Sequence, residues 1–152
     1  MRVRVLGLDP GSQKMGLAVW DTGSHTILQR TIAPATDIDG LLALIATWEY
    51  EVIAVGNATG GRQVTGLLKG AQQRGELPRV PILSVDERNS TLEGRQLYWK
   101  AVPRTGWRRL VPLGLQTPPV PVDDFAAAVV ASRARPGDSS GSWDEFLTAW
   151  RA

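Results

Sequence analysis

The sequence is organised around residues 3–20, which read Val3-Arg-Val-Leu-Gly-Leu-Asp9-Pro-Gly-Ser-Gln-Lys-Met-Gly16-Leu-Ala-Val-Trp20. The apolar residues before Asp9 suit a strand that is buried on both faces. The Pro-Gly-Ser that follows is typical of a tight turn, after which a second strand begins. An ionised carboxylate at the end of a buried strand costs free energy unless it is paired. Asp9 is therefore either a solvated turn residue or part of a metal or phosphate site at the strand end.

The composition favours a globular α/β protein whose chemistry depends on oxygen ligands. The chain has 152 residues, of which 43% are hydrophobic and 21% charged, and this suits one domain with a core. No apolar run approaches the roughly 20 residues that span a bilayer, and no secretory signal is visible, so we expect a cytoplasmic protein with no membrane contact. There is no cysteine and a single histidine, His25, which excludes thiolate metal sites and disfavours a Ser-His-Asp triad. Any catalysis is expected to rest on carboxylates.

The order of apolar segments predicts a mixed sheet with helices on both faces. Residues 25–32 complete an antiparallel meander of three strands. Strands are then expected at 51–55 and 80–85, and helices at about 37–48, 63–74, 90–101 and 123–133. Such βα units place the first strand at the centre of the sheet.

The chain is expected to divide into a domain at 1–135 and a C-terminal segment at 136–152. This segment consists of a Gly/Ser linker and a short amphipathic helix. Ser142 begins a capping-box pattern. The apolar stripe of the helix is Trp143, Phe146, Leu147 and Trp150. So short a helix is marginal alone, so we expect it to dock on the body or on a partner subunit.

Carboxylates recur where the predicted strands end. Asp9 ends the first strand, Glu87 follows the fifth, and Asp123 and Asp124 open the helix from 123 onward. Carboxylates that converge in a sheet repel one another unless a cation neutralises them. Oxygen ligands suit Mg²⁺ or Mn²⁺, and two such ions would support phosphodiester cleavage. The alternative for the late pair is simpler, because the helix dipole favours acids in a first turn.

Two polar segments indicate contact with nucleic acid. The Gly-rich loop 56–63 lies between a strand and a helix, where backbone amides bind phosphate, although an ordinary βα loop is the alternative. Residues 102–121 contain five of the ten prolines and several arginines but no acid, which suits phosphate contact and base stacking or, alternatively, a solvated basic loop. The residues expected to contact nucleic acid are Lys14, Asn57, Thr59, Arg62, Arg88, Arg104, Trp107, Arg108 and Arg109.

Three motifs, taken in order over residues 5–130, resemble those of the YqgF/RuvX group. Leu6-Gly-Leu-Asp9-Pro-Gly-Ser-Gln-Lys-Met-Gly16-Leu-Ala-Val19 is similar to its opening motif. Asp86-Glu87-Arg88 is similar to its Asp-Glu-Arg motif, and Val122-Asp123-Asp124-Phe-Ala-Ala127 to its Asp-x-x-Ala-Ala helix start. The group is RNase H-like and related to the RuvC Holliday junction resolvases. The resemblance implies a five-stranded sheet of order 3-2-1-4-5 and Mg²⁺- or Mn²⁺-dependent nuclease activity on structured DNA or on RNA such as ribosomal precursors.

The resemblance also implies site residues and partners, and two alternative functions stand beside it. Asp9 and Glu87 would be metal ligands, and the third ligand would be Asp123 or Asp124, because both keep the Ala-Ala spacing; the apolar Val122 favours Asp123. A junction resolvase cuts two symmetric strands, so a homodimer is expected if the substrate is a junction. The loop 56–63 departs from the group and resembles that of the YqgF-like domain of the transcription accessory protein Tex, so a non-catalytic nucleic-acid-binding module is one alternative. An actin-like kinase opens with a similar motif but needs two such domains.

Overall fold

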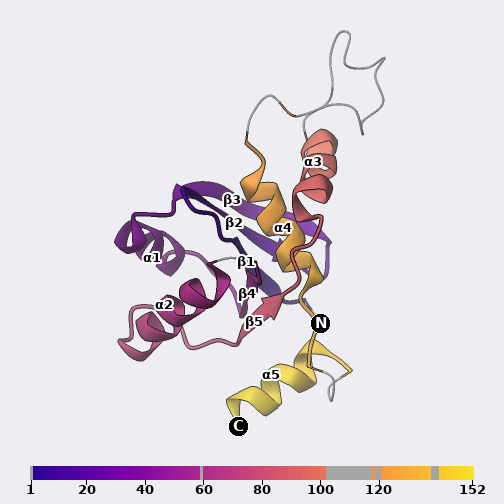
Figure 1. Cartoon of the computed structure of the whole chain (residues 1–152). Helices are drawn as coiled ribbons and strands as arrows, with labels where there is room; N and C mark the ends of the chain where they lie inside the picture. Colours follow the sequence, from indigo (N-terminus) through magenta and orange to yellow (C-terminus); the bar gives the residue numbers. More distant parts are fainter. Residues whose placement is uncertain (1, 59, 102–117, 119–120, 138–140) are drawn as a thin grey trace.

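A computed structural model describes residues 2–58, 60–101, 118, 121–137 and 141–152. It contains a five-stranded sheet of order β3-β2-β1-β4-β5. The strands are β1 (Arg4–Asp9), β2 (Lys14–Asp21), β3 (Thr26–Pro34), β4 (Val52–Gly56) and β5 (Ile82–Val85). β1 pairs antiparallel with β2 and parallel with β4, and β4 pairs parallel with β5. The expected mixed sheet, with the first strand at its centre, is confirmed (Figure 1).

Helices cover both faces of this sheet. α1 (Ile38–Ala46) and α2 (Gly61–Gln73) lie on one side, whereas α3 (Ser90–Ala101) and α4 (Asp123–Arg133) lie on the other (Figure 1). Leu6 and Leu8 of β1 belong to the core cluster beneath α1 and α2. Val3 and Val5 belong to the opposite cluster, with residues of α4 and of α5 (Trp143–Arg151). The central strand is thus buried on both faces, as its apolar sequence predicted.

Helix α4 lies directly on β1 and β2. Small side chains form this contact and allow a close approach. Ala18 of β2 is buried in one cluster with Ala127 and Ala128 of α4. At Gly16 the approach is so close that a Cβ would overlap the carbonyl oxygen of Asp123. Because Gly16 is the β2 partner of Asp9, this contact brings the first turn of α4 to the end of β1. The small residues therefore position a candidate site residue as well as the helix.

Some boundaries differ from the sequence-based expectation. α2 begins at Gly61, two residues earlier than expected, because Gly60 adopts a φ of 95° and serves as its N-cap. β5 begins after Pro81 and lies at the edge of the sheet, where a residue that cannot donate a hydrogen bond is tolerated. α1 ends at Ala46, so that Trp48 packs on the core from beyond the helix.

Helix α5 docks on the body through only part of its apolar stripe. Leu147 is buried, and Trp143 and Phe146 pack against the same cluster. Trp150 is 44% exposed, so the stripe expected to run through Trp150 contacts the body only over its first two turns. Ser142 caps the helix, since its side chain accepts a hydrogen bond from the Glu145 amide. The division of the chain at residue 135 stays a prediction.

Within the described ranges, no helix combines the length and the apolar character needed to cross a bilayer.

Candidate active site

Asp9 and Glu87 meet at the edge of the sheet that is formed by the carboxyl ends of its parallel strands. β1, β4 and β5 run parallel, so their carboxyl ends lie at the same edge. Asp9 is the last residue of β1, and Glu87 follows β5 by two residues. Between them β4 ends at Gly56, where a Cβ would overlap Oε2 of Glu87. The glycine thus lets the Glu87 side chain cross the end of β4 toward Asp9.

The backbone around Glu87 fixes its carboxyl group. The Ala58 amide donates to Glu87 Oε1 at 3.0 Å, and the Ser90 amide donates to the Glu87 carbonyl at 3.0 Å. Asn89 adopts a left-handed φ of 61° in this turn. Glu87 Oε2 is buried and has no hydrogen-bond partner among the residues that the structure describes. A buried carboxylate oxygen without a partner is unfavourable, and either a proton or a cation would satisfy it.

The environment of Asp9 favours its neutral form. The pKa of Asp9 is raised from 3.8 to about 7, first by burial, then by the interaction with the Glu87 side chain, and then by the charges of Glu87 and Asp123. A carboxyl group normally ionises well below neutral pH. A cation beside these carboxylates would reverse the effect, because it favours their ionised forms.

The adjacent residues Asp123 and Asp124 have different environments. Asp123 is half-buried, and its charge acts on Asp9. Asp124 is 5% exposed; its Oδ2 accepts a hydrogen bond from Nη1 of Arg30 at 2.8 Å, and its Oδ1 accepts one from the Phe125 amide at 3.0 Å. The Arg30 guanidinium also lies over the Phe125 ring, 4.5 Å from its centroid. Asp123 therefore acts on the acid pair, whereas Asp124 ties α4 to β3.

Arg30 did not stand out in the sequence. Its partner Asp124 lies 94 residues further along the chain, and no local pattern marks such a pair.

The three carboxylates fit a hard cation in chemistry. They offer only oxygen, and Glu87 contributes a buried oxygen without a partner. Over the part of the chain that the structure describes, no three His, Cys, Asp or Glu side chains are grouped closely enough to hold an ion. The close pair is Asp9 with Glu87, and Asp123 would have to approach it to share one ion.

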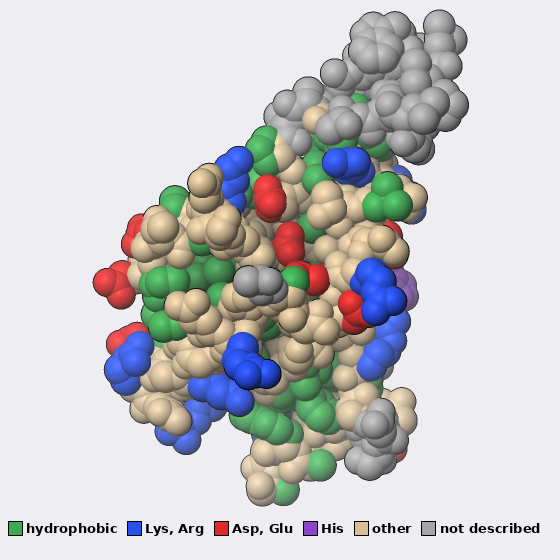
Figure 2. Space-filling model, in the orientation of Figure 1, with side chains coloured by type: hydrophobic (Ala, Val, Ile, Leu, Met, Phe, Trp, Pro, Cys, Tyr) green, Lys and Arg blue, Asp and Glu red, His purple; other side chains and the backbone are tan. Residues whose placement is uncertain are grey.

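A broad groove lies beside the acid pair. It has a volume of about 800 Å³ and extends from the turn after β1 to α1 and α2. Its polar lining includes Ser12, Thr36 and Gln63, and its apolar lining includes Ile38 and Leu67. Figure 2 shows acidic side chains across the middle of the visible face, with Lys and Arg side chains on both sides. Asp9, Glu87 and Asp123 are each half-buried, so their side chains are partly accessible from the surface.

The residues expected to contact nucleic acid are only partly placed. Four of them are exposed: Lys14 begins β2 beside the end of β1, Asn57 and Arg88 follow β4 and β5, and Arg62 lies in the first turn of α2. Arg88 is 83% exposed and lies 3.9 Å from Asp86. The other expected contacts, Thr59, Arg104, Trp107, Arg108 and Arg109, lie outside the described residues.

Comparison of the sequence with known proteins gives related bacterial proteins over most of the chain. No model of a known protein family matches. A protein of Desulforamulus reducens named "Putative pre-16S rRNA nuclease" is 30% identical over 139 residues, which cover 84% of this chain and 93% of that protein. Proteins of the same name from Caldanaerobacter subterraneus and Coxiella burnetii are 28% identical, over 70% and 82% of this chain and 84% and 86% of theirs.

Comparison of the structure gives Holliday junction resolvases. Fowlpox virus resolvase, solved with substrate Holliday junction DNA, matches with a TM-score of 0.53 and 9% identity over 97% of this chain and 98% of its own. Thermus thermophilus RuvC in complex with a Holliday junction substrate matches with a TM-score of 0.50 and 17% identity over 86% and 91%. At such identities the likeness is one of fold, and the fold is RNase H-like.

Proposed function

The chain belongs to the YqgF family, and from this premise we propose that it is a metal-dependent nuclease that hydrolyses phosphodiester bonds in structured nucleic acid. The observation that carries the proposal is the acid pair at the carboxyl edge of the sheet. Asp9, whose pKa is raised to about 7, lies beside Glu87, which has a buried oxygen with no partner in the described ranges. A carboxyl group whose pKa is as strongly raised as that of Asp9, beside an open groove, is typical of an active site.

In this proposal three carboxylates hold the cations. Asp9, Glu87 and Asp123 would bind one or two Mg²⁺ or Mn²⁺ ions, which when bound polarise the phosphate and lower the pKa of a water. The Ala58 amide orients Glu87 through Oε1, and Oε2 has no partner within the described part of the chain. Asp124 has another role, since its salt bridge with Arg30 fixes the helix that carries Asp123.

The substrate is a polyanion that approaches the acids along the groove between α1 and α2. Exposed Lys14, Asn57, Arg62 and Arg88 would bind its backbone phosphates near the acids. The names of the relatives favour a ribosomal RNA precursor as substrate. The resolvases of the same fold favour a DNA junction, which a homodimer would cut symmetrically.

The test is cleavage of a matched panel in Mn²⁺: a four-way DNA junction, single-stranded DNA, single-stranded RNA and precursor 16S ribosomal RNA. Asp9→Asn is compared with Glu49→Gln, which neutralises an 84% exposed carboxylate far from the cluster in sequence. We expect at least one substrate to be cut by the wild-type and Glu49→Gln proteins but not by Asp9→Asn. RNA cleavage alone would indicate a processing nuclease, and paired nicks in the junction alone a resolvase. Binding without any Asp9-dependent cleavage would contradict the proposal and favour a non-catalytic binding module.

A further inference from the structure

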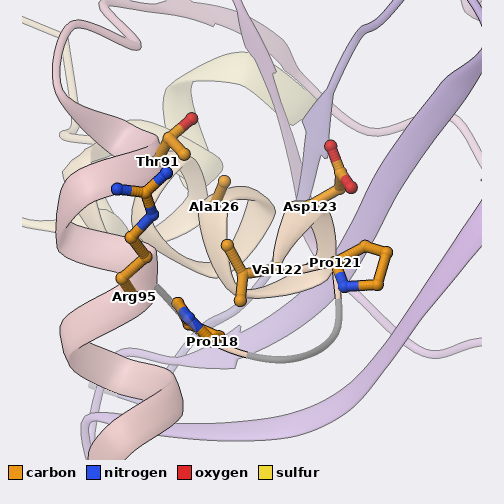
Figure 3. Close-up of a pocket in the computed structure, with 7 residues that line it drawn as sticks. All are labelled: Thr91, Arg95, Pro118, Pro121, Val122, Asp123 and Ala126. Carbon is orange, nitrogen blue, oxygen red and sulfur yellow. The ribbon is translucent and has the colours of Figure 1, made fainter. Parts of the chain in front are cut away.

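A second hollow lies where α3 meets the first turn of α4, and Asp123 forms part of its wall. Its volume is about 210 Å³. Figure 3 shows Thr91 and Arg95 extending from α3 on one side, Val122 and Ala126 at the centre, and Asp123 across from the α3 residues. The described residues that line it are Thr91, Arg95, Pro118, Pro121, Val122, Asp123 and Ala126. At about 30 Å³ of liquid volume per water, such a space holds several waters or one small anion.

The packing of the two helices fixes this arrangement. Gly94 lies against α4, where a Cβ would be only 2.8 Å from the Ala126 amide nitrogen. The contact sets the distance between the helices immediately beside Arg95. Thr91 and Arg95 are four residues apart on a helix, so their side chains lie on the same face. A hydroxyl and a guanidinium are thus held together on one wall.

Arg95 differs from the arginines around it. Arg30 pairs with Asp124, and Arg133 pairs with Glu93 at 3.0 Å and donates to the Asp86 carbonyl at 2.9 Å. These two arginines tie secondary-structure elements together. Arg95 is half-buried and forms no ion pair with any residue that the structure describes. A partly desolvated guanidinium of this kind is suited to a phosphate, which it binds through two parallel N–H donors.

We propose that the hollow is a phosphate-binding subsite, in which Arg95 and Thr91 bind a backbone phosphate of the nucleic acid strand next to the phosphate that is cleaved. The inference rests on the proposed function, because Asp123 on the opposite wall is one of the three carboxylates assigned to the metal. A strand that lies across Asp9 and Glu87 and continues toward α3 would pass over this hollow. Arg95 then positions the strand and takes no part in the chemical step.

The first experiment measures binding without divalent ions, so that it does not depend on cleavage. Fluorescence anisotropy with a labelled RNA hairpin and a DNA hairpin of the same sequence is recorded from 50 to 250 mM NaCl. The variants are Arg95→Gln, Arg95→Lys and the matched control Arg79→Gln. Arg79 precedes β5, so it lies at the opposite edge of the sheet from the acids. Thermal melting of each variant verifies that it is folded.

For Arg95→Gln we expect Kd to rise about tenfold at low salt, the value for one lost hydrogen-bonded charge. The slope of log Kd against log salt should become shallower by the amount that one phosphate contact contributes. Arg95→Lys should keep the slope, because it keeps the charge, and Arg79→Gln should match wild type. A loss in the RNA arm alone or the DNA arm alone would identify which backbone occupies the subsite. Equal slopes for Arg95→Gln, Arg79→Gln and wild type would overturn the inference.

A cleavage assay separates this inference from the proposed function. In Mn²⁺, Arg95→Gln should raise KM about tenfold with a smaller change in kcat, and Arg95→Lys should restore part of it. If the wild-type protein cuts nothing, the proposed function fails, but the binding slopes still decide the role of Arg95. If Arg95→Gln loses kcat at unchanged KM and unchanged binding slope, the subsite is refuted while the nuclease stands.

Discussion

Replacement of Asp9 by asparagine should make the protein more stable at alkaline pH while it abolishes cleavage. Asp9 ionises with a pKa of about 7 in the folded state and near 3.8 in the unfolded chain. Three pKa units correspond to about 4 kcal/mol, which is an upper limit, and solvent screening of this half-buried group reduces it to about 2 kcal/mol. Because the folded pKa is the higher one, the penalty is absent below pH 4, grows between pH 4 and 7, and is complete above pH 7.

The asparagine side chain carries no charge, so the variant avoids this penalty. At pH 8, without divalent ions, we expect Tm of Asp9→Asn to exceed that of wild type by about 4–8 °C, since 1 kcal/mol shifts Tm by about 2–4 °C in a chain of this length. The difference should shrink toward zero near pH 4. Differential scanning fluorimetry at pH 4, 5, 6, 7 and 8 measures it directly. Glu49→Gln, which removes an exposed carboxylate paired with Arg4, should change stability by no more than about 1 kcal/mol at any pH.

Addition of Mn²⁺ provides an independent measurement of the same cluster. An ion that binds only the folded state at 100 times its Kd stabilises that state by about 2.7 kcal/mol. Wild type should gain this stabilisation and Asp9→Asn should lose most of it. An Asp9→Asn protein that is less stable than wild type at pH 8, or that has the same advantage at pH 5 and pH 8, would refute the raised pKa of Asp9. Retained cleavage would refute the metal assignment.

Three further substitutions test the geometry around the site. Gly56→Ala should lower the rate of single-turnover cleavage by tenfold or more, because the added methyl group overlaps Oε2 of Glu87 and displaces that carboxyl group. A displacement of about 1 Å can cost 100-fold in rate. Unchanged cleavage would contradict the position of Glu87. Asp124→Ala should lower the free energy of unfolding by about 2 kcal/mol in a urea titration, since it removes charged hydrogen bonds to Arg30 and the helix start. A change within 0.5 kcal/mol would exclude that role. Leu147→Ala, in a side chain that is 1% exposed, should cost about 2–3 kcal/mol and increase hydrogen exchange in α5, whereas a neutral result would show that α5 does not dock.

Much of the fold follows from local patterns in the sequence. The apolar run before Asp9 specifies a strand that is buried on both faces, and the structure buries Leu6 and Val5 on opposite sides. Short turns make the first three strands antiparallel, and crossover helices make the last two parallel. The sheet order follows from these connections together with the family resemblance. Helix ends were less predictable, because at Gly60 a left-handed backbone conformation decides where α2 begins.

The candidate site was only partly predictable, because its decisive contacts are distant in sequence. Asp123 and Asp124 both fit the motif, and consecutive residues on a helix differ by about 100° in direction. Only the folded chain shows that Arg30, on the far strand of the sheet, pairs with Asp124, and that the charge of Asp123 acts on Asp9. The sequence did not mark Arg95 either, since a cation on an amphipathic helix ordinarily faces solvent.

The geometry of the acids depends on the backbone more than on polar side-chain contacts. Asp9 ends the central strand, and α4 reaches it only because Gly16 has no Cβ to meet the Asp123 carbonyl. Glu87 reaches it only because Gly56 leaves the end of β4 open. One amide hydrogen bond, from Ala58, then orients its carboxyl group. Addition of a single methyl group at either glycine should therefore disturb the site more than removal of a neighbouring polar side chain. The same close contacts hold α4 on the sheet, so the packing that stabilises this fold also buries Asp9 near other carboxylates and creates the unfavourable environment that a cation would relieve.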